Sequence, residues 1–403
     1  MTILFGHPTG NPNSHHSALA HFESGNLEAF CVAWMPSAKT VQGLRRIALG
    51  RRSFARLERR QFAPLELAPT VQGRAGEWRR LALRAFGFGD EGLSYEANDW
   101  LMRTMARECH RPRVTAVHAY EDCAAWQFEE AKRLGKACIY DLPIGYYPAW
   151  EATQRELART YSDWLPARGL SASRHVRPLQ KLREMELADL VIAPSSFVER
   201  TVREFHPEKR IARAPYGVDL DFWRPRTRVE VDRPIRFLYA GQISLRKGIP
   251  LLLDAWSRAG LRDASLTLVG TWQLSEIKRS RLPEGVVVLP PCSSEALREL
   301  YRESDVFLFP SFFEGFGLVL LEAMACGLPI LATEATAAPD LVNDAWGRTY
   351  ARESIEALVE HLRWFVANRD RLTEMAVAAR SRAEEFTWSG YRAAVAGAVK
   401  GFV

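Results

Sequence analysis

Residues 310–333 have the sequence PSFFEGFGLVLLEAMACGLPILAT, and its pattern changes along the segment. The chain leaves an apolar run, crosses a loop with two glycines, and continues into good helix formers over residues 318–325. Gly327 and Pro329 end this helix, and another apolar run follows. The stretch therefore predicts a strand, a loop, a helix and a second strand, the repeating unit of a parallel α/β sheet.

The same alternation of short apolar runs and longer helical patterns continues on both sides of this segment. In the first half of the chain the apolar runs are residues 2–5, 29–34, 114–119, 137–142 and 190–195. In the second half they are residues 235–241, 265–270, 286–290, 306–311 and 329–333. Two series of βαβ units predict an α/β fold of two Rossmann-like domains that face an interdomain cleft.

Residues 214–234 separate the two series and are rich in proline, glycine and charge, as an exposed connection is. We predict an amino-terminal domain over residues 1–215 and a carboxyl-terminal domain over residues 216–385. A last helix, 386–403, is expected to return to the amino-terminal domain. Ligands of open parallel sheets bind beyond the carboxyl ends of the strands, so the site is expected between the domains.

The composition is that of a globular protein: 403 residues, 47% of them hydrophobic and 25% charged. It excludes disordered and fibrous chains and a single small module. No run approaches the ~18–20 apolar residues of a membrane span, and the first residues lack a basic and apolar leader. We therefore expect a cytoplasmic protein. The six cysteines form no C-x-x-C pair, which excludes a zinc ribbon.

The positive charge is concentrated between residues 45 and 84, where eleven arginines face three glutamates. Apolar residues lie among these arginines, as in a basic helix that binds an anionic membrane surface. For a cytoplasmic protein this surface would be the inner face of the membrane. A solvated helical face explains the pattern equally well, and both interpretations stay open. No nucleic-acid-binding motif accompanies the charge, so we expect no nucleic-acid partner.

The loop and helix at 314–325 have the features of an anion site. The first turn of a helix carries unpaired amides and partial positive charge, and Gly315 and Gly317 let a phosphate approach closely. Glu322, one turn into the helix, can accept the vicinal hydroxyls of a ribose, and Glu314 can reach the hydroxyls of a second sugar. The alternative is a pair of solvated glutamates on a surface helix.

The stretch EGFGLVLLEAMACGLP resembles the E-G-F-G…E-A-M-A-x-G-x-P signature of retaining glycosyltransferases of family 4, the glycosyl transferases group 1, which have the GT-B fold. The resemblance implies that residues 1–215 form the acceptor domain and residues 216–385 the nucleotide-sugar donor domain. It implies that Glu314 contacts the hydroxyls of the donor sugar. It also implies that the amides of Phe316, Gly317 and Leu318, next to Gly315, hold the diphosphate and that Glu322 binds the ribose.

A second segment, FLYAGQISLRKGIPLLLDAW at 237–256, is similar to the family's V-G-R-L-x-x-x-K-G-x-x-x-L-L-x-A. Lys247 matches the family's lysine, whereas Gln242 replaces its arginine in the donor site. We expect Arg246 to take over that phosphate contact, because a diphosphate leaving group needs compensating positive charge. Gly270, in SLTLVGTW, stands at the family's donor-contacting glycine.

The amino-terminal half matches the family less closely. The loop GHPTGNPNSHHSAL (6–19) occupies the place of the family's glycine-rich loop over the diphosphate, with Gly10 toward the donor. Its histidines raise the possibility of a metal site, but their spacing places no ligand set on one helix face, so no metal is expected. Asp141 stands where the family has a histidine; it could orient a sugar or acceptor hydroxyl, or cap the turn after its strand.

An aromatic cluster follows Asp141, and Tyr146, Tyr147 and Trp150 belong to it. Aromatic faces stack on sugars, which makes these residues candidates for an acceptor surface; the same cluster could pack a lid.

Together these features predict a retaining glycosyltransferase in cell-surface glycan or glycolipid biosynthesis. It would move a hexose from a nucleotide-diphosphate sugar to a glycan, lipid-linked or small-molecule acceptor. Glu314, Lys247, Arg246 and Asp141 are the candidate catalytic residues, and no cofactor is expected beyond the donor substrate. A non-catalytic sugar-nucleotide-binding partner of another transferase and a GT-B epimerase remain the alternatives.

Overall fold

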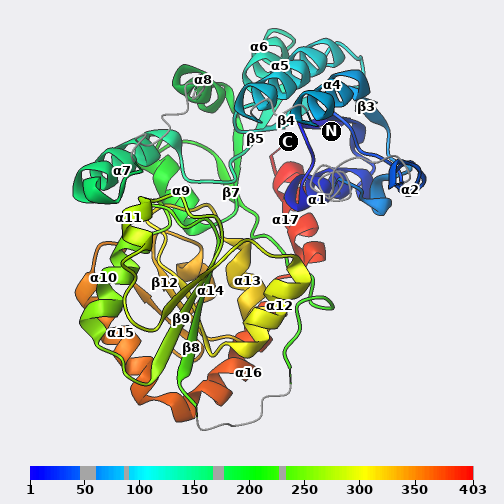
Figure 1. Cartoon of the computed structure of the whole chain (residues 1–403). Coiled ribbons are helices and arrows are strands. Elements are labelled where there is room, and N and C mark those ends of the chain that lie inside the picture. The colour runs from blue at the N-terminus through cyan, green and yellow to red at the C-terminus, as the bar shows by residue number, and fades with distance from the viewer. Residues whose placement is uncertain (46–59, 86–89, 167–176, 227–232, 403) are drawn as a thin grey trace.

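The computed structural model describes residues 1–45, 60–85, 90–166, 177–226 and 233–402. Residues 46–59 of the basic segment predicted at 45–84 therefore lie outside the described residues. Two sheets, each covered by helices on both faces, form two lobes (Figure 1). All strand pairs in both sheets are parallel, which confirms the predicted α/β fold of two Rossmann-like domains.

The first sheet has seven strands in the order β3-β2-β1-β4-β5-β6-β7. Their bounds are β1 Ile3–His7, β2 Leu27–Val32, β3 Thr70–Gln72, β4 Ala116–Tyr120, β5 Ala137–Asp141, β6 Leu190–Ala193 and β7 Ile211–Arg213. The second sheet has six strands in the order β10-β9-β8-β11-β12-β13. Their bounds are β8 Ile235–Ala240, β9 Ala264–Val269, β10 Val286–Leu289, β11 Val306–Phe309, β12 Ile330–Thr333 and β13 Gly347–Tyr350.

Helices cover both faces of each sheet, so the central strands β4, β6, β11 and β12 are buried along their whole length. In the first lobe these are α1 Pro12–Glu23, α2 Ala38–Arg45, α4 Arg74–Ala85, α5 Asp90–Glu108, α6 Ala125–Arg133, α7 Tyr147–Thr160, α8 Pro178–Leu187 and α9 Ser196–Arg203. In the second lobe they are α10 Ile249–Ala259, α11 Glu276–Arg279, α12 Ser294–Glu303, α13 Leu318–Ala325, α14 Ala338–Leu341, α15 Ile355–Ala367 and α16 Leu372–Ala383. Short 3₁₀ turns occur at Ala63–Leu65, Ser162–Trp164 and Arg369–Arg371.

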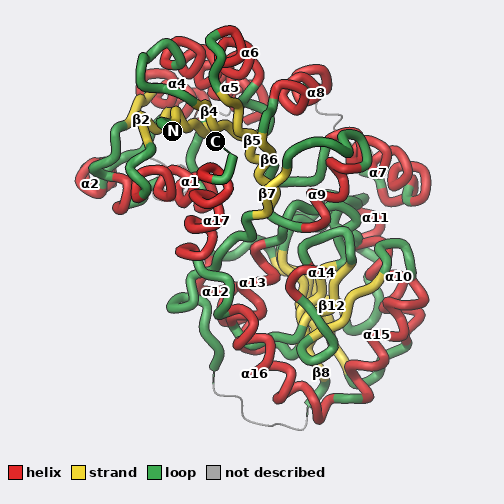
Figure 2. The backbone as a smooth tube through the Cα atoms, turned by 180° about the vertical axis from the view of Figure 1, so that it is seen from behind, coloured by secondary structure: helices red, strands yellow, loops and turns green. Residues whose placement is uncertain are grey.

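The last helix, α17 Trp388–Lys400, lies against α1 of the first lobe, whereas α16 packs on α13 of the second (Figure 1). The chain therefore crosses between the lobes twice, near residues 214–218 and again near 384–388. The two crossings touch: the Val218 amide donates to the Phe386 carbonyl at 3.0 Å. Seen from behind, β7, which precedes the first crossing, and α17, which follows the second, lie near the boundary between the two lobes (Figure 2).

The carboxyl-terminal loops of the two sheets meet at the lobe boundary, on the side where β5 and β6 face β11 and β12. The Ser195 hydroxyl, at the start of α9, donates to the Gly315 carbonyl of the opposite lobe. The neighbouring Ser196 amide donates to Asp340 Oδ2 at 2.6 Å, and Arg213 lies 3.2 Å from the other oxygen of that carboxylate. These bonds hold the loop that contains Glu314 against the first domain.

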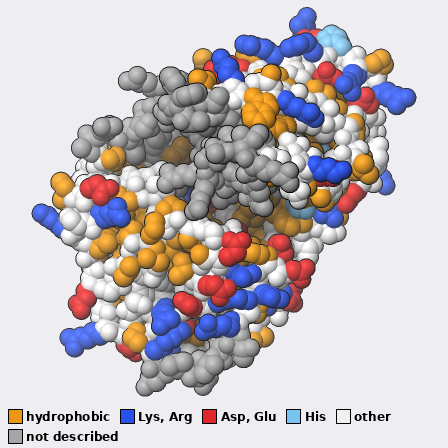
Figure 3. All heavy atoms as spheres, turned by 45° about the vertical axis from the view of Figure 1, so that its right-hand side comes forward, with side chains coloured by type: hydrophobic (Ala, Val, Ile, Leu, Met, Phe, Trp, Pro, Cys, Tyr) orange, Lys and Arg blue, Asp and Glu red, His pale blue; other side chains and the backbone are white. Residues whose placement is uncertain are grey.

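None of the helices in the described residues is long and apolar enough to cross a membrane. On the face that Figure 3 presents, basic and acidic side chains are interspersed over the described surface.

Candidate functional site

Three of the predicted catalytic residues lie together at the carboxyl ends of the neighbouring strands β8 and β11. Lys247 Nζ forms an ion pair with Glu314 Oε2, and Arg246 Nη1 lies 3.3 Å from the same oxygen. Arg246 also donates to the Phe313 carbonyl at 3.0 Å, which fixes its guanidinium beside the loop. The side chains of Lys247 and Glu314 are only 12% and 14% exposed, so water screens this cluster weakly.

Burial and charge act in opposite directions on these groups. Burial alone would raise the pKa of Glu314, but Lys247 and Arg246 outweigh it and hold that pKa below its usual range. Burial lowers the pKa of Lys247, and Arg246 adds to this effect while Glu314 opposes it. Two cations therefore share one carboxylate, and the cluster has positive charge in excess, as a site for an anion requires.

The first turn of α13 lies beside this cluster. Gly317 stands at its N-cap with φ 84°, and an added Cβ would lie 2.6 Å from the Phe309 ring, so only glycine fits. Within the described residues, the amides of Phe316, Gly317 and Leu318 donate no hydrogen bond. Unpaired amides together with the positive end of a helix can bind a phosphate.

Gly315 forms the closest approach between the lobes. A Cβ at this position would lie 1.7 Å from the carbonyl oxygen of Pro143, which belongs to the first domain. Phe313, two residues earlier, is buried between Phe197 and Trp150 of that domain, with ring centroids 5.2 and 5.3 Å away. The residues before and after Glu314 therefore both pack against the first domain.

The remaining donor-site candidates occupy the same ends of the second sheet. Glu322, in α13, accepts from the Tyr301 hydroxyl at 3.4 Å, and burial raises the pKa of its carboxyl to about 7. Gln242 follows β8 and has an exposed side chain. Its backbone carbonyl accepts a hydrogen bond from the Tyr239 hydroxyl at 2.7 Å. Gly270, after β9, packs directly on the carbonyl of Gly241.

In the first domain, Gly10 lies in the loop between β1 and α1 with φ 71°. Its amide donates to His7 Nδ1 at 2.9 Å, and burial, aided by His15 and Arg60, lowers the pKa of His7 to about 3, so the ring is neutral. The histidines of this segment thus serve as hydrogen-bonding and packing groups. In the described part of the chain, no cluster of three His, Cys, Asp or Glu side chains could hold a metal.

Asp141 lies in a buried polar network at the end of β5 and is 1% exposed. His118 Nε2 is 3.6 Å from its Oδ2. Burial raises the pKa of Asp141 to about 7, although hydrogen bonds from Tyr120 and Ser17 oppose this shift. Ser17 in turn lies 2.6 Å from the hydroxyl of Tyr391, in α17. The structure does not bring Asp141 into the Glu314 cluster.

The predicted acceptor aromatics do not form a common surface. Tyr146 is 2% exposed; its hydroxyl lies 3.1 Å from His206 Nε2, and burial raises its pKa to about 12. The Tyr147 hydroxyl reaches Glu151 at 3.5 Å. Trp150 packs on Phe313 and so supports the loop of Glu314. Tyr146 and Trp150 therefore pack against other side chains, which fits the second interpretation of this cluster, a packed lid, better than an acceptor surface.

Sequence reasoning missed the residues that join the lobes, above all Asp340 and the pair Ser195 and Ser196. The signal for Ser195 was its position between a strand and a helix, where its side chain caps α9 by accepting from the Val198 amide. Its second bond, to the Gly315 carbonyl, links residues 120 positions apart, and no local pattern encodes it.

Comparison with known proteins agrees with this geometry. Residues 222–382 match the family model of glycosyl transferases group 1. The alpha-maltose-1-phosphate synthase of Mycolicibacterium smegmatis is 32% identical over 51% of this chain and 61% of that protein. The O-antigen chain mannosyltransferase B of Escherichia coli is 32% identical over 38% of this chain and 42% of its own length. The chain thus spans about half the length of these relatives.

Solved structures resemble the chain along its full length. The sucrose-phosphate synthase of Thermosynechococcus elongatus superposes with a TM-score of 0.66 at 15% identity, over 100% of this chain and 98% of the other. HepE of Anabaena, in complex with UDP, gives 0.63 at 16% identity, with both chains fully covered. Both domains therefore have the arrangement of the GT-B fold, as the sequence motifs predicted.

Proposed function

We propose that the protein is a glycosyltransferase, because residues 222–382 match the family model of glycosyl transferases group 1. It moves a hexose from a nucleotide-diphosphate sugar to a hydroxyl of a glycan, lipid-linked or small-molecule acceptor, with retention at the anomeric carbon. The observation that carries this proposal is the cluster of Glu314, Lys247 and Arg246 beside the unpaired amides at the start of α13.

The cluster suits a donor whose leaving group is a diphosphate. The amides of residues 316–318 and the positive end of α13 would bind its phosphate oxygens. A diphosphate would also attract Lys247 and Arg246, which now share Glu314. Each cation would then exchange a carboxylate for a phosphate, and Glu314 would become free to accept the hydroxyls of the sugar. Cations that stabilise the developing charge on the phosphate supply what a divalent metal would supply, and we propose no cofactor.

The same geometry favours retention. Glu314, the carboxylate of the cluster, is held ionised by two cations, which makes it a weak base toward an acceptor hydroxyl. The departing phosphate oxygen can take the acceptor's proton on the face it leaves, so no enzyme nucleophile is required. Glu322 would meet the ribose: its carboxyl, with a pKa raised to about 7, lies one turn into the helix that begins at the phosphate site.

The test is a transfer assay with UDP-, GDP- and ADP-sugars, in which the anomeric configuration of the product is read by NMR. Glu314→Gln and Lys247→Ala should each lower kcat by about 10²- to 10³-fold, as loss of a preorganised electrostatic contact does. Glu276→Gln is the matched control, because Glu276 is 74% exposed and pairs with Arg279, not with a residue of the cluster.

The outcomes separate the alternatives. Unchanged turnover in both variants would refute the assigned roles. Nucleotide binding by the wild type without turnover of any donor would favour the non-catalytic partner, and a change in the donor without acceptor would favour an epimerase. UDP-sugars are the first choice of donor, because the similar HepE structure contains UDP.

A further inference from the structure

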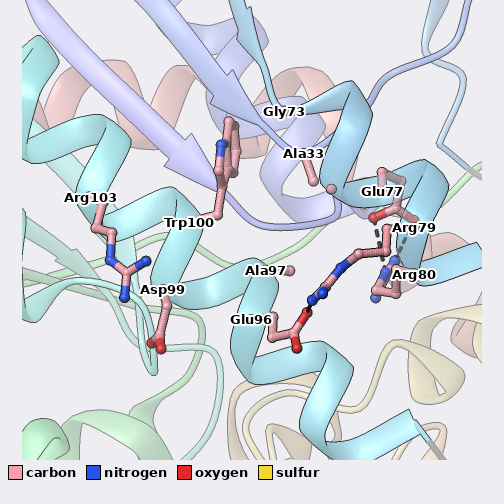
Figure 4. Close-up of a pocket in the computed structure, with 11 residues that line it drawn as sticks. Ala33, Gly73, Glu77, Arg79, Arg80, Glu96, Ala97, Asp99, Trp100 and Arg103 are labelled. Atoms are coloured by element: carbon pink, nitrogen blue, oxygen red, sulfur yellow. Dashed lines mark hydrogen bonds and ion pairs between the residues drawn. The ribbon is translucent and has the colours of Figure 1, made fainter. Parts of the chain in front are cut away.

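A cavity of about 300 Å³ lies in the amino-terminal domain, and none of the predicted donor-site residues lines it (Figure 4). It opens at the carboxyl ends of β2 and β3, where Ala33 and Gly73 line it. Helices α4 and α5 supply its charged side chains and Trp100. Ligands of parallel sheets bind at this edge of the strands, so the position alone suits a substrate.

The cavity is joined to the loop that we assign to the donor diphosphate. The Ala33 amide donates to the Pro8 carbonyl at 3.1 Å, and Pro8 lies in the same β1–α1 loop as Gly10. Asn98, between the wall residues Ala97 and Asp99 of α5, donates from its side chain to the carbonyl of Asp122, two residues after β4. The cavity therefore lies at the ends of β2 and β3, next to the loops that follow β1 and β4.

The carboxylates of the cavity already have guanidinium partners. Arg80 donates to both oxygens of Glu77, at 2.9 and 2.6 Å. Arg79 pairs with Glu96 in the view of Figure 4. Asp99 is held by Arg177 at 2.5 and 3.2 Å.

Arg103 is the remaining cation of the cavity wall. Among the described residues it forms no ion pair, and its guanidinium lies 5.4 Å from the ring centre of Trp126. Because the three carboxylates are neutralised by their own arginines, Arg103 gives the cavity an excess of positive charge. A guanidinium in this state is suited to a bidentate contact with a phosphate or carboxylate.

Trp100 adds an aromatic wall. Its ring packs directly over Gly73, where a Cβ would lie 2.4 Å away, and this contact fixes the orientation of the indole. Aromatic rings stack on the C–H faces of sugars, and the surrounding carboxylates and guanidinium groups can bond sugar hydroxyls. The wall thus combines a stacking surface, polar groups and one cation that has no carboxylate partner among the described residues.

We propose that this cavity is the acceptor subsite and that the acceptor is an anionic saccharide, whose phosphate or carboxylate binds Arg103. The proposal rests on the proposed glycosyltransferase function and replaces the acceptor surface predicted at Tyr146, Tyr147 and Trp150. Those aromatics are occupied by packing and by hydrogen bonds to other residues of the chain.

The test compares Arg103→Gln with Arg107→Gln in the full-length protein. Arg107 is exposed on the same helix, one turn further on, and does not line the cavity. Acceptor use and direct binding by calorimetry are measured with glucose 6-phosphate, glucuronate and glucose. Hydrolysis of the donor without acceptor is measured in parallel. We expect binding of an anionic probe by the wild type, and a weakening of about tenfold or more in Arg103→Gln alone, with donor hydrolysis unchanged.

The outcomes keep the two proposals apart. If no variant turns over donor but an anionic sugar binds and requires Arg103, the subsite stands and the glycosyltransferase function fails. Equal binding by both variants, a preference for glucose over its anionic forms, or no binding of any anionic probe would overturn the subsite. Preference for glucose 6-phosphate over glucuronate would identify the anion as a phosphate, and the reverse order as a carboxylate.

Discussion

Replacement of Gly315 by alanine should separate the two domains without disturbing either one. The added Cβ would lie 1.7 Å from the Pro143 carbonyl oxygen, whereas real Cβ contacts are at least 3.0 Å, so the boundary must open by roughly 1.3 Å. The Pro143 oxygen belongs to the backbone, and the backbone fixes the position of the Cβ, so neither atom can rotate away. Gly315 does not have a positive φ, so alanine meets no strain in its own backbone and the effect is purely steric.

A shift of about 1 Å between a catalytic group and its substrate can cost on the order of 10² in rate. We therefore expect kcat for sugar transfer, or for donor hydrolysis, to fall by about a hundredfold in Gly315→Ala. Nucleotide binding should be retained, because the amides of α13 lie within one domain. Gly397→Ala is the control, since its Cβ would meet nothing within 4 Å. A kcat within twofold of the wild type would show that the close approach at Pro143 has no part in activity.

Two further substitutions test the buried network and the lobe boundary. Asp141→Asn removes a carboxyl whose pKa burial raises from 3.8 to about 7 in the folded chain. Between about pH 4 and 7 the folded wild type binds more protons than the unfolded chain, so its free energy of unfolding falls as the pH rises. The variant should lack this contribution in urea unfolding curves at pH 5, 6 and 7.5, and an equal slope in both proteins would contradict it. Asp340→Ala removes the acceptor of the Ser196 amide, at 2.6 Å, and the ion pair with Arg213. It should weaken the closed arrangement by about 1–2 kcal/mol, seen as a KM for donor that rises about tenfold relative to Asp344→Ala, an 89% exposed control. An unchanged KM would mean that Asp340 does not hold the lobes together.

The carboxyl-terminal half was predictable because its site lies in contiguous segments. The helix at 318–325 has the predicted bounds, and a single pair of neighbouring loops brings Glu314 to Lys247. Once β8 and β11 pair as adjacent parallel strands, their carboxyl ends must meet. The strands β3, β7 and β13 were missed because each has only three or four residues at a sheet edge, too short for a periodic signal.

The amino-terminal half depends on contacts that no local pattern encodes. The partners of Asp141 include Ser17, which itself bonds Tyr391, a residue 374 positions further along the chain. Tyr146 looked like an exposed aromatic near the cleft, but His206 and the neighbouring Phe205 cover it. Whether an aromatic residue faces a ligand or another helix is decided by packing between distant segments.

The paired crossings between the lobes constrain how the molecule can move. One connecting segment would act as a swivel, about which the domains could rotate in any direction. Two segments, tied by the Val218–Phe386 bond and by the packing of Gly217 against Thr387 and Trp388, define a line instead of a point. Bending about that line remains easy, whereas twisting would stretch one segment against the other. The domains should therefore open by a hinge motion about this one axis, and substrates should enter and leave on the side opposite the two crossing segments.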